Sequence, residues 1–262
     1  MILNAFQIDA FTDKVFGGNP AFVVMLEENL PVDTLLLIAK ENAVPETAFV
    51  IRDNDSFMLR WFTPDIEMDL CGHATLAAAH VLFKEYGYAE PVICFKTVSG
   101  DLFVSREDES YVMDFPMREG EKATLPIEVY DSLSIKPIGV YKSRDYMLVY
   151  KSRSEIENID IERSIFDEIN LDPGGVVITA PGDDCDFVSR YFTPQSTILE
   201  DPVTGSAHCT LAPYWGKILN KTTMFAKQLS ERGGSIYCTL AEGRVLLKGK
   251  AVTYAKAQLY IN

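Results

Sequence analysis

Apolar and polar side chains alternate along several short stretches of the chain, and this period of two predicts β-strands. The first stretch is ILNAFQIDAF at 2–11, followed after the GGNP turn by the apolar run AFVVML. TAFVIR and FMLRWFT, joined by the polar DNDS, are typical of a hairpin. Further strand-like runs are predicted within 92–116, 139–150, 174–180, 185–193 and 234–261.

Leucines and alanines recur at helical spacing between these strands. PVDTLLLIAKENAV predicts a helix that starts at Pro31 or Asp33, and ATLAAAHVLFKEYG predicts an Ala-rich helix closed by Gly87. GSAHCTLAPYWGKIL predicts a helix from 205 onward, and ERSIFDEIN predicts a short one. The mixture of strands and helices indicates an α+β protein.

One pentapeptide is nearly repeated: RWFTP at 60–64 and RYFTP at 190–194. The same offset places TAF near TAP and Cys71 opposite Asp201, and a three-residue slip then matches GHAT with GSAH. Convergent use of a strand–turn–helix unit is one explanation. We favour a duplication that gives two similar halves facing each other across a cleft, where small ligands usually bind. The polar segment after Pro116 predicts halves at 1–116 and 117–252.

Composition excludes several classes of protein. Hydrophobic residues make up 47% and charged residues 24% of the 262, which is ordinary for a globular chain. The net charge of −14 argues against a nucleic-acid or anionic-membrane partner. The 5 cysteines form no C-x-x-C pair, so neither a disulfide framework nor a zinc ribbon is predicted. The N-terminal segment lacks a signal-peptide pattern, so a cytoplasmic location is expected.

Gly72 and Gly205 each open a predicted helix at equivalent positions of the repeat. Glycine allows a ligand to approach the backbone, and the first amides of a helix attract anions. Each glycine alone could serve only a tight turn. Two of them at matching positions favour binding of a carboxylate-bearing substrate.

Cys71 and Asp201 precede these helices, one in each half. A cysteine beside a helix N-terminus can have a lowered pKa, and a carboxylate there is a candidate acid or base. Cys71 could instead be a small core residue, and Asp201 could be a helix N-cap. Glu46, which precedes an apolar strand, is either a turn residue or a general acid/base.

The three histidines are His73, His80 and His208. His73 lies at a helix start, whereas His80 is expected to pack or to face solvent. A metal site of Cys71, His73 and His208 is conceivable, but no spacing resembles a zinc motif, and we predict no metal. The sequence also lacks a P-loop and a G-x-G-x-x-G after a strand, so no nucleotide cofactor is indicated.

These residues together resemble the PhzF-like family, named for the isomerase of phenazine biosynthesis, which shares the fold of diaminopimelate epimerase. The resemblance spans nearly the whole chain and is carried by FGGNPAFVV, ETAFV, RWFTPDIEMDLCGHATLAAAHVLF, EDPVTGSAHCTLAPYW, SERGG and GRVLLKGKAVT. It implies two pseudo-symmetric domains, each a β-sheet wrapped around a central helix, with the active site in the interdomain cleft. It also implies that the last strand, 253–262, returns to the first domain.

The resemblance further implies proton transfer without a cofactor, with Glu46 as the general acid/base. The family's accompanying site residues fall on Gly72, His73, Asp201, Gly205 and Ser206, and Asn19 is expected to join the substrate-binding set. Cys71 matches the first cysteine of the epimerase relatives, but Asp201 stands where the second would be. Cys71 is therefore only a secondary candidate.

We conclude from the sequence that the chain is an isomerase of a small carboxylate-bearing metabolite, expected as a homodimer. Two alternatives stay open: an epimerase or racemase that uses Cys71 and Asp201, and a ligand-binding protein without turnover. Retention of Glu46, His73 and Asp201 together speaks against the binding protein.

Overall fold

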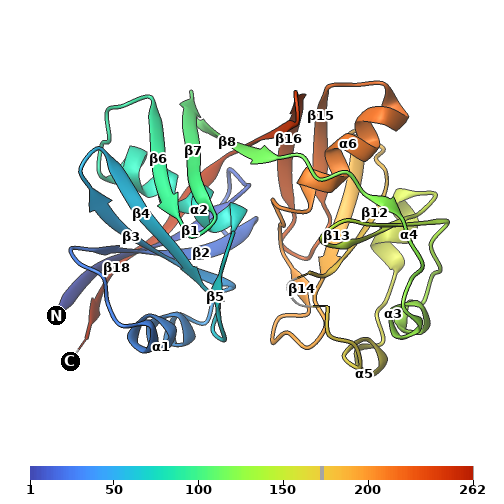
Figure 1. The fold of residues 1–262 in the computed structure, drawn as a ribbon, viewed down its shortest axis with the longest axis horizontal. Coiled ribbons are helices and arrows are strands. Elements are labelled where there is room, and N and C mark those ends of the chain that lie inside the picture. Colours follow the sequence, from blue (N-terminus) through green and yellow to red (C-terminus); the bar gives the residue numbers. More distant parts are fainter. Residues whose placement is uncertain (172–173, 262) are drawn as a thin grey trace. The chain divides into compact units, whose positions relative to one another are not determined.

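The computed structural model describes residues 1–171 and 174–261. The chain forms two compact units: unit 1 comprises Met1–Asp114 with Leu247–Asn262, and unit 2 comprises Phe115–Leu246 (Figure 1). Among the described residues, no helix is both long and apolar enough to cross a membrane.

Unit 1 is built on one long sheet with two α-helices. Its strands are β1 (Ile2–Ala10), β2 (Asn19–Leu26), β3 (Glu46–Asp53), β4 (Ser56–Phe62), β5 (Glu67–Met68), β6 (Val92–Thr97), β7 (Gly100–Glu107), β8 (Ser110–Pro116) and β18 (Ala251–Tyr260). Its helices are α1 (Val32–Asn42), α2 (Gly72–His80) and the π-helical turn Val81–Glu85 that continues α2.

The sheet of unit 1 runs in the order β18, β1, β2, β3, β4, β6, β7, β8. Its pairs are antiparallel except β2–β3 and β4–β6, which are parallel. β5 is a short antiparallel partner at the end of β4. The hairpin predicted from TAFVIR and FMLRWFT is therefore β3 and β4.

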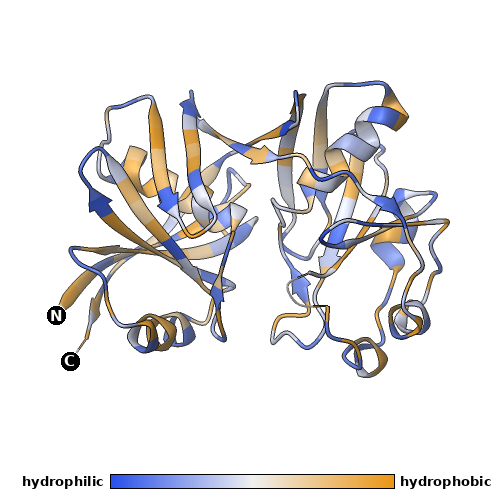
Figure 2. Cartoon of the chain, in the orientation of Figure 1, coloured by the Kyte–Doolittle hydropathy of each residue, from blue (hydrophilic) through white to orange (hydrophobic). Residues whose placement is uncertain are grey.

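The two helices of unit 1 cover opposite faces of this sheet (Figure 1). On one face, Leu35 and Ile38 of α1 pack against Phe49 and Phe62. Figure 2 shows both hydrophobic and hydrophilic residues on α1, because its other side meets solvent. α2 lies on the other face, in contact with β1, β2, β3 and β18, and all nine of its residues are buried. The central helix expected from the resemblance is α2.

Unit 2 repeats this plan with more helices. Its strands are β9 (Glu121–Lys122), β10 (Gly139–Lys142), β11 (Tyr146–Val149), β12 (Val176–Pro181), β13 (Phe187–Phe192), β14 (Glu200–Asp201), β15 (Thr223–Gln228), β16 (Gly234–Ala241) and β17 (Arg244–Gly249), the last crossing into unit 1. Its helices are α3 (Ile127–Ser132), α4 (Arg153–Asn158), α5 (Arg163–Phe166) and α6 (His208–Leu219).

The strand pairing of unit 2 follows the same sequence of directions as unit 1. β9, β10 and β11 pair antiparallel, β11–β12 is parallel, β12–β13 is antiparallel, β13–β15 is parallel and β15–β16 is antiparallel. β14 is the short partner of β13, as β5 is of β4. The two units thus share one order of strand directions, although the partner of β1 is the last strand, β18, whereas the partner of β10 is the strand before it, β9. Both units are α+β.

Three expectations about local structure were wrong. α6 begins at His208 and not at Gly205, because residues 205–207 form tight i→i+3 turns. The Ala-rich helix does not run regularly to Gly87: it loosens into a π-helical turn, with the Tyr86 amide bonded to the Val81 carbonyl at 3.1 Å. Sequence patterns also failed to predict α3, α4 and β15, together with the two-residue strands β5, β9 and β14.

The repeated pentapeptide ends a strand in each unit, as predicted, and its arginine forms the same ion pair twice. Arg60 holds both carboxylate oxygens of Glu67 at 2.7 Å. Arg190 holds those of Glu200 at 2.7 and 2.9 Å. Each pair ties the end of the long strand to its short partner, and each guanidinium lies over the phenylalanine two residues on.

We expect Arg190→Ala to destabilise the protein more than Arg60→Ala. Arg190 also donates to the carbonyl oxygens of Ile156 and Ile159 at the end of α4, both at 3.1 Å, so its removal leaves these acceptors without a donor. The expected losses are about 3 kcal/mol for Arg190 and about 1 kcal/mol for Arg60. Urea unfolding would measure both, with Arg52→Ala on the exposed end of β3 as control. Equal losses would contradict this explanation.

Candidate active site

Glu46 is the first residue of β3, at the edge of the buried part of the sheet. α1 ends at Asn42, and Ala43 adopts a left-handed conformation with φ 52° that turns the chain toward β3. The next five residues of β3 are buried, whereas the Glu46 side chain stays 15% exposed. A carboxylate at this position is fixed by the strand and still reachable by a small molecule.

His73, the second residue of α2, is almost fully buried and meets Glu46. Its Nε2 lies 3.1 Å from Glu46 Oε2, and its side chain is 4% exposed. On the other edge of the ring, Nδ1 lies 3.0 Å from Asn19 Nδ2 and 3.5 Å from Cys71 Sγ. The structure therefore brings together four of the predicted site residues, from the starts of β2, β3 and α2.

The Glu46–His73 pair has an ion-pair distance without hydrogen-bond alignment. Within the described part of the chain, neither Glu46 Oε2 nor His73 Nε2 makes an aligned hydrogen bond, although both atoms are buried. Polar atoms in such a position usually have a partner. Both atoms thus retain the capacity to bond a third group placed beside them.

Charge in this cluster favours a protonated imidazole. Burial opposes protonation of His73, but its interactions with Cys71 and Glu46 outweigh burial and raise its pKa well above the ordinary value. Burial, and then the Glu46 carboxylate, also raise the pKa of the Cys71 thiol. Cys71 therefore stays a neutral thiol near pH 7, and Glu46 is the charge that supports the imidazolium there.

This result corrects the expectation of a lowered pKa for Cys71. The helix N-terminus favours a thiolate, but burial and a carboxylate nearby disfavour it more strongly. Cys71 is 6% exposed and is the N-cap residue of α2, with an extended backbone. A neutral buried thiol is a poor proton acceptor, so Cys71 fits the core-residue interpretation better than that of a base.

Gly72 and His73 supply the first amides of α2. The first intrahelical bonds reach the carbonyl of Cys71, which accepts from the Thr75 amide at 3.2 Å and from the Thr75 hydroxyl at 2.5 Å. The amides before Thr75 precede the regular hydrogen-bond pattern and lie at the positive end of the helix. This is the chemistry that the sequence analysis expected for a carboxylate site.

The remaining predicted residues, Asp201, Gly205 and Ser206, lie in unit 2. Asp201 ends β14, and its Oδ2 accepts a hydrogen bond from the hydroxyl of Thr204. Gln228, which is 1% exposed, accepts from the Thr204 amide at 2.9 Å and donates to the Asp201 carbonyl at 2.7 Å. The segment that carries Asp201 is thus held from both ends.

Sequence reasoning missed Thr204 and Gln228. Thr204 stands beside Asp201 in EDPVTG, so a hydroxyl three residues after a carboxylate was a visible signal. Gln228 ends β15, a short strand that was not predicted because polar residues flank it.

The structure changes which residues correspond between the two units. Phe62 pairs with Glu67, and Phe192 pairs with Glu200, so the loop after the pentapeptide is three residues longer in unit 2. Asp201 therefore corresponds to Met68, and the counterpart of Cys71 is Thr204. The predicted pairing of Cys71 with Asp201 was wrong.

The same comparison corrects the TAF–TAP match and shows that Glu46 has no equivalent carboxylate in unit 2. Thr47 pairs with Phe62, and Val176 pairs with Phe192, so Thr47 corresponds to Val176 and not to Thr179. Glu46 then corresponds to Gly175, where a Cβ would lie 2.6 Å from the Tyr191 hydroxyl oxygen. Unit 2 has no carboxylate at this place.

Glu46, Cys71 and His73 also satisfy a simple geometric test for metal ligands, since one donor atom of each lies within 4.8 Å of the others. However, Cys71 approaches Nδ1 of the imidazole, whereas Glu46 approaches Nε2. These two ring nitrogens point in different directions, so the group fits a chain of proton carriers better than one metal ion.

Comparison with known proteins gives a consistent result. A family model described as "Phenazine biosynthesis-like protein" matches residues 8–257. A protein of Pseudomonas aeruginosa named as an uncharacterized isomerase is 43% identical, with 100% of both chains covered. A crystal structure of a PhzF-family phenazine biosynthesis protein from Enterococcus faecalis has a TM-score of 0.94 at 45% identity, again with 100% of both chains covered.

A more distant structural match shows the fold alone. A probable proline racemase from Agrobacterium radiobacter has a TM-score of 0.68 at 10% identity, with 99% of this chain and 93% of the other covered. The α+β fold is therefore that of the PhzF and racemase–epimerase group.

Proposed function

Because the chain belongs to the phenazine biosynthesis-like family, we propose that it is an isomerase that moves a proton within a small carboxylate-bearing metabolite. Relatives named as isomerases at 43% and 40% identity support the reaction class. The observation that carries the proposal is the 3.1 Å approach of Glu46 to the buried imidazole of His73.

In the proposed reaction Glu46 accepts a proton from a substrate carbon and becomes a carboxylic acid. The electron pair of the broken C–H bond shifts through the substrate toward its carboxylate-bearing end. A second carbon then takes the proton back from Glu46, so the enzyme ends as it began. A charged His73 orients Glu46 and stabilises negative charge that develops beside it.

Binding is assigned to the backbone and to one amide side chain. The amides of Gly72 and His73 would hold the substrate carboxylate at the start of α2. Asn19, whose side-chain amide lies beside Nδ1 of His73, would fix the orientation of the ring, with the amide oxygen turned to accept from the protonated Nδ1. Asp201, Gly205 and Ser206 stay predicted contributors from unit 2. No metal, nucleotide or other cofactor is required by this chemistry, and we expect the enzyme to act as a homodimer.

Hydrogen exchange with solvent tests this proposal directly. The protein would be incubated in D₂O with a panel of small hydroxy, amino and unsaturated ring carboxylic acids, and ¹H NMR would follow the loss of C–H signals. We expect one class to take up deuterium at a new carbon and to change its double-bond position. Ligands that raise Tm but never exchange would instead support a binding protein without turnover.

A further inference from the structure

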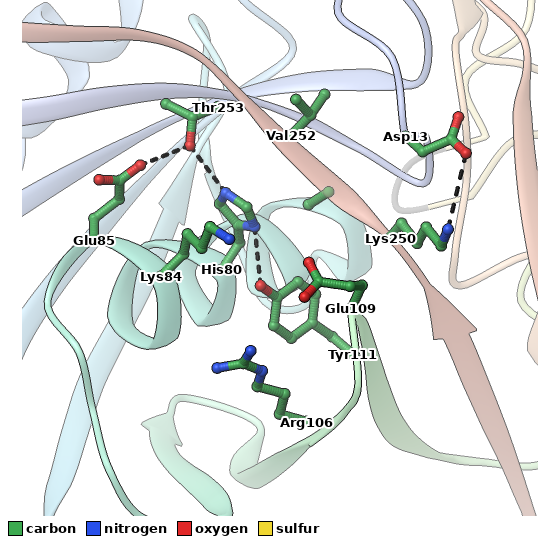
Figure 3. A pocket seen from close by; sticks show the side chains of 11 residues that line it. Asp13, His80, Lys84, Glu85, Arg106, Glu109, Tyr111, Lys250, Val252 and Thr253 are labelled. Carbon is green, nitrogen blue, oxygen red and sulfur yellow. Dashed lines mark hydrogen bonds and ion pairs between the residues drawn. The ribbon is translucent and has the colours of Figure 1, made fainter.

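Unit 1 contains a cavity of about 430 Å³, lined by several charged side chains, at the C-terminal end of α2 (Figure 3). Its lining comes from the end of α2 and the π-helical turn, from β7 and β8, and from the start of β18. His80, in this lining, lies seven residues after His73, which is roughly 10 Å along a helix. Neither Glu46 nor His73 lines the cavity, so it is separate from the candidate active site.

The floor of this cavity is a chain of hydrogen bonds with one consistent direction. His80 Nε2 lies 2.9 Å from Thr253 Oγ1, which donates to Glu85 at 2.9 Å. Because the single Thr253 proton goes to Glu85, His80 must donate from Nε2, and its Nδ1 then accepts from the Tyr111 hydroxyl at 3.0 Å. The Tyr111 hydroxyl therefore donates its hydrogen bond to His80, and its oxygen can still accept a hydrogen bond from a ligand.

The charges around the cavity are only partly neutralised. Two of its carboxylates have lysine partners: Glu85 pairs with Lys256, and Asp13 with Lys250 at 3.9 Å. Lys84, Arg106 and Glu109 form no ion pair within the residues that the structure describes; Arg106 Nε bonds only the Asp108 carbonyl, at 3.0 Å. Two cations and one carboxylate thus remain for a ligand, in a chain whose net charge is −14.

We propose that this cavity binds a small carboxylic acid that also carries a hydroxyl or ammonium group. Lys84 and Arg106 face the carboxylate, because charge-assisted hydrogen bonds to cations are the strongest available there. Glu109 and the Tyr111 oxygen accept from the hydroxyl or ammonium group. The volume is within the range of small-molecule sites. The site does not depend on the function proposed for Glu46.

Histidine NMR gives a direct test, because the 3 histidines of the chain report on different places. Protein labelled with ¹⁵N,¹³C-histidine would be titrated at constant pH with L-malate, L-aspartate and succinate, up to tens of millimolar. Malate and aspartate should shift the His80 resonances, and succinate, which lacks the extra donor, should shift them more weakly. His208 should stay unchanged.

Substitutions of Lys84 and Arg106 test whether these two side chains bind the carboxylate of the ligand. Arg106→Gln and Lys84→Gln should each weaken malate binding about tenfold. Both residues are exposed, so the variants should fold, and Lys40→Gln on α1 is the matched control. Unchanged affinity in both variants, or no shift of His80 with any acid, would overturn the proposal. A shift of His73 alone would also overturn it, while supporting carboxylate binding at the candidate active site.

Discussion

Replacing Glu46 with glutamine is expected to abolish proton exchange on the substrate that the D₂O experiment identifies. Glutamine keeps the size of the side chain and its contact with His73, but it cannot accept a proton from carbon. Removal of a general base typically costs 10²- to 10⁴-fold in rate, so we expect a loss of about 10³-fold or more in turnover. Ligand affinity should change only a few-fold, because the α2 amides remain. NMR exchange rates and calorimetry would measure the two quantities.

A control and a competing variant make this result decisive. Glu41→Gln removes an exposed carboxylate from the end of α1 and should leave exchange unchanged. Cys71→Ser should also leave exchange near normal, because the thiol is neutral at the working pH. Full activity in Glu46→Gln together with inactivity in Cys71→Ser would reverse the assignment and support the epimerase mechanism.

The structure weakens that epimerase mechanism in a way the sequence could not. Two symmetric bases require matching acidic groups in the two units, but the counterpart of Cys71 is Thr204 and that of Glu46 is Gly175. Thr204 instead donates to Asp201, a residue whose own counterpart is Met68. The titratable residues of the two units therefore do not match, and unit 2 has no equivalent of the Glu46–His73 pair.

Sequence patterns predicted most of the strands, including those that end at the two repeated pentapeptides, because period-two alternation and turn residues are local signals. Register was the main failure. The loop from Thr63 to Ile66 and the longer loop from Thr193 to Leu199 close with the same backbone bond, from the threonine amide to the last carbonyl, at 2.9 Å in each case. The sequence comparison placed the three extra residues after Asp201 and not in this loop, so Asp201 was aligned with Cys71.

The site was predictable to the extent that single residues carry its chemistry. Glu46, His73 and Asn19 were named from short motifs, and the structure places them in contact. Long-range properties were not accessible from the sequence. The raised pKa of Cys71 depends on its burial in the folded chain. The role of Gln228 depends on the pairing of β15 with β13, which is distant in sequence.

Acidification is expected to destabilise both units through one buried histidine in each. Burial lowers the pKa of His80 and of His208 to about 4 from an ordinary 6.5. Between these pH values the two histidines are protonated in the unfolded chain but neutral in the native chain. The free energy of unfolding therefore falls as pH falls from about 6.5 to 4. Each histidine should cost about 3 kcal/mol by pH 4. Lowered carboxyl pKa values, such as that of Asp186, act in the same direction.

Histidine NMR across this range checks the cause as well as the size. His208 donates from Nδ1 to the Thr204 carbonyl at 2.9 Å, whereas His80 donates from Nε2, so the two should show opposite neutral tautomers in ¹⁵N spectra. His73 is the internal control: its raised pKa keeps it charged throughout, and the stability it contributes is lost only as pH rises through that pKa. Titration of His80 or His208 near 6.5, or urea midpoints that stay flat from pH 7 to 5, would contradict this account.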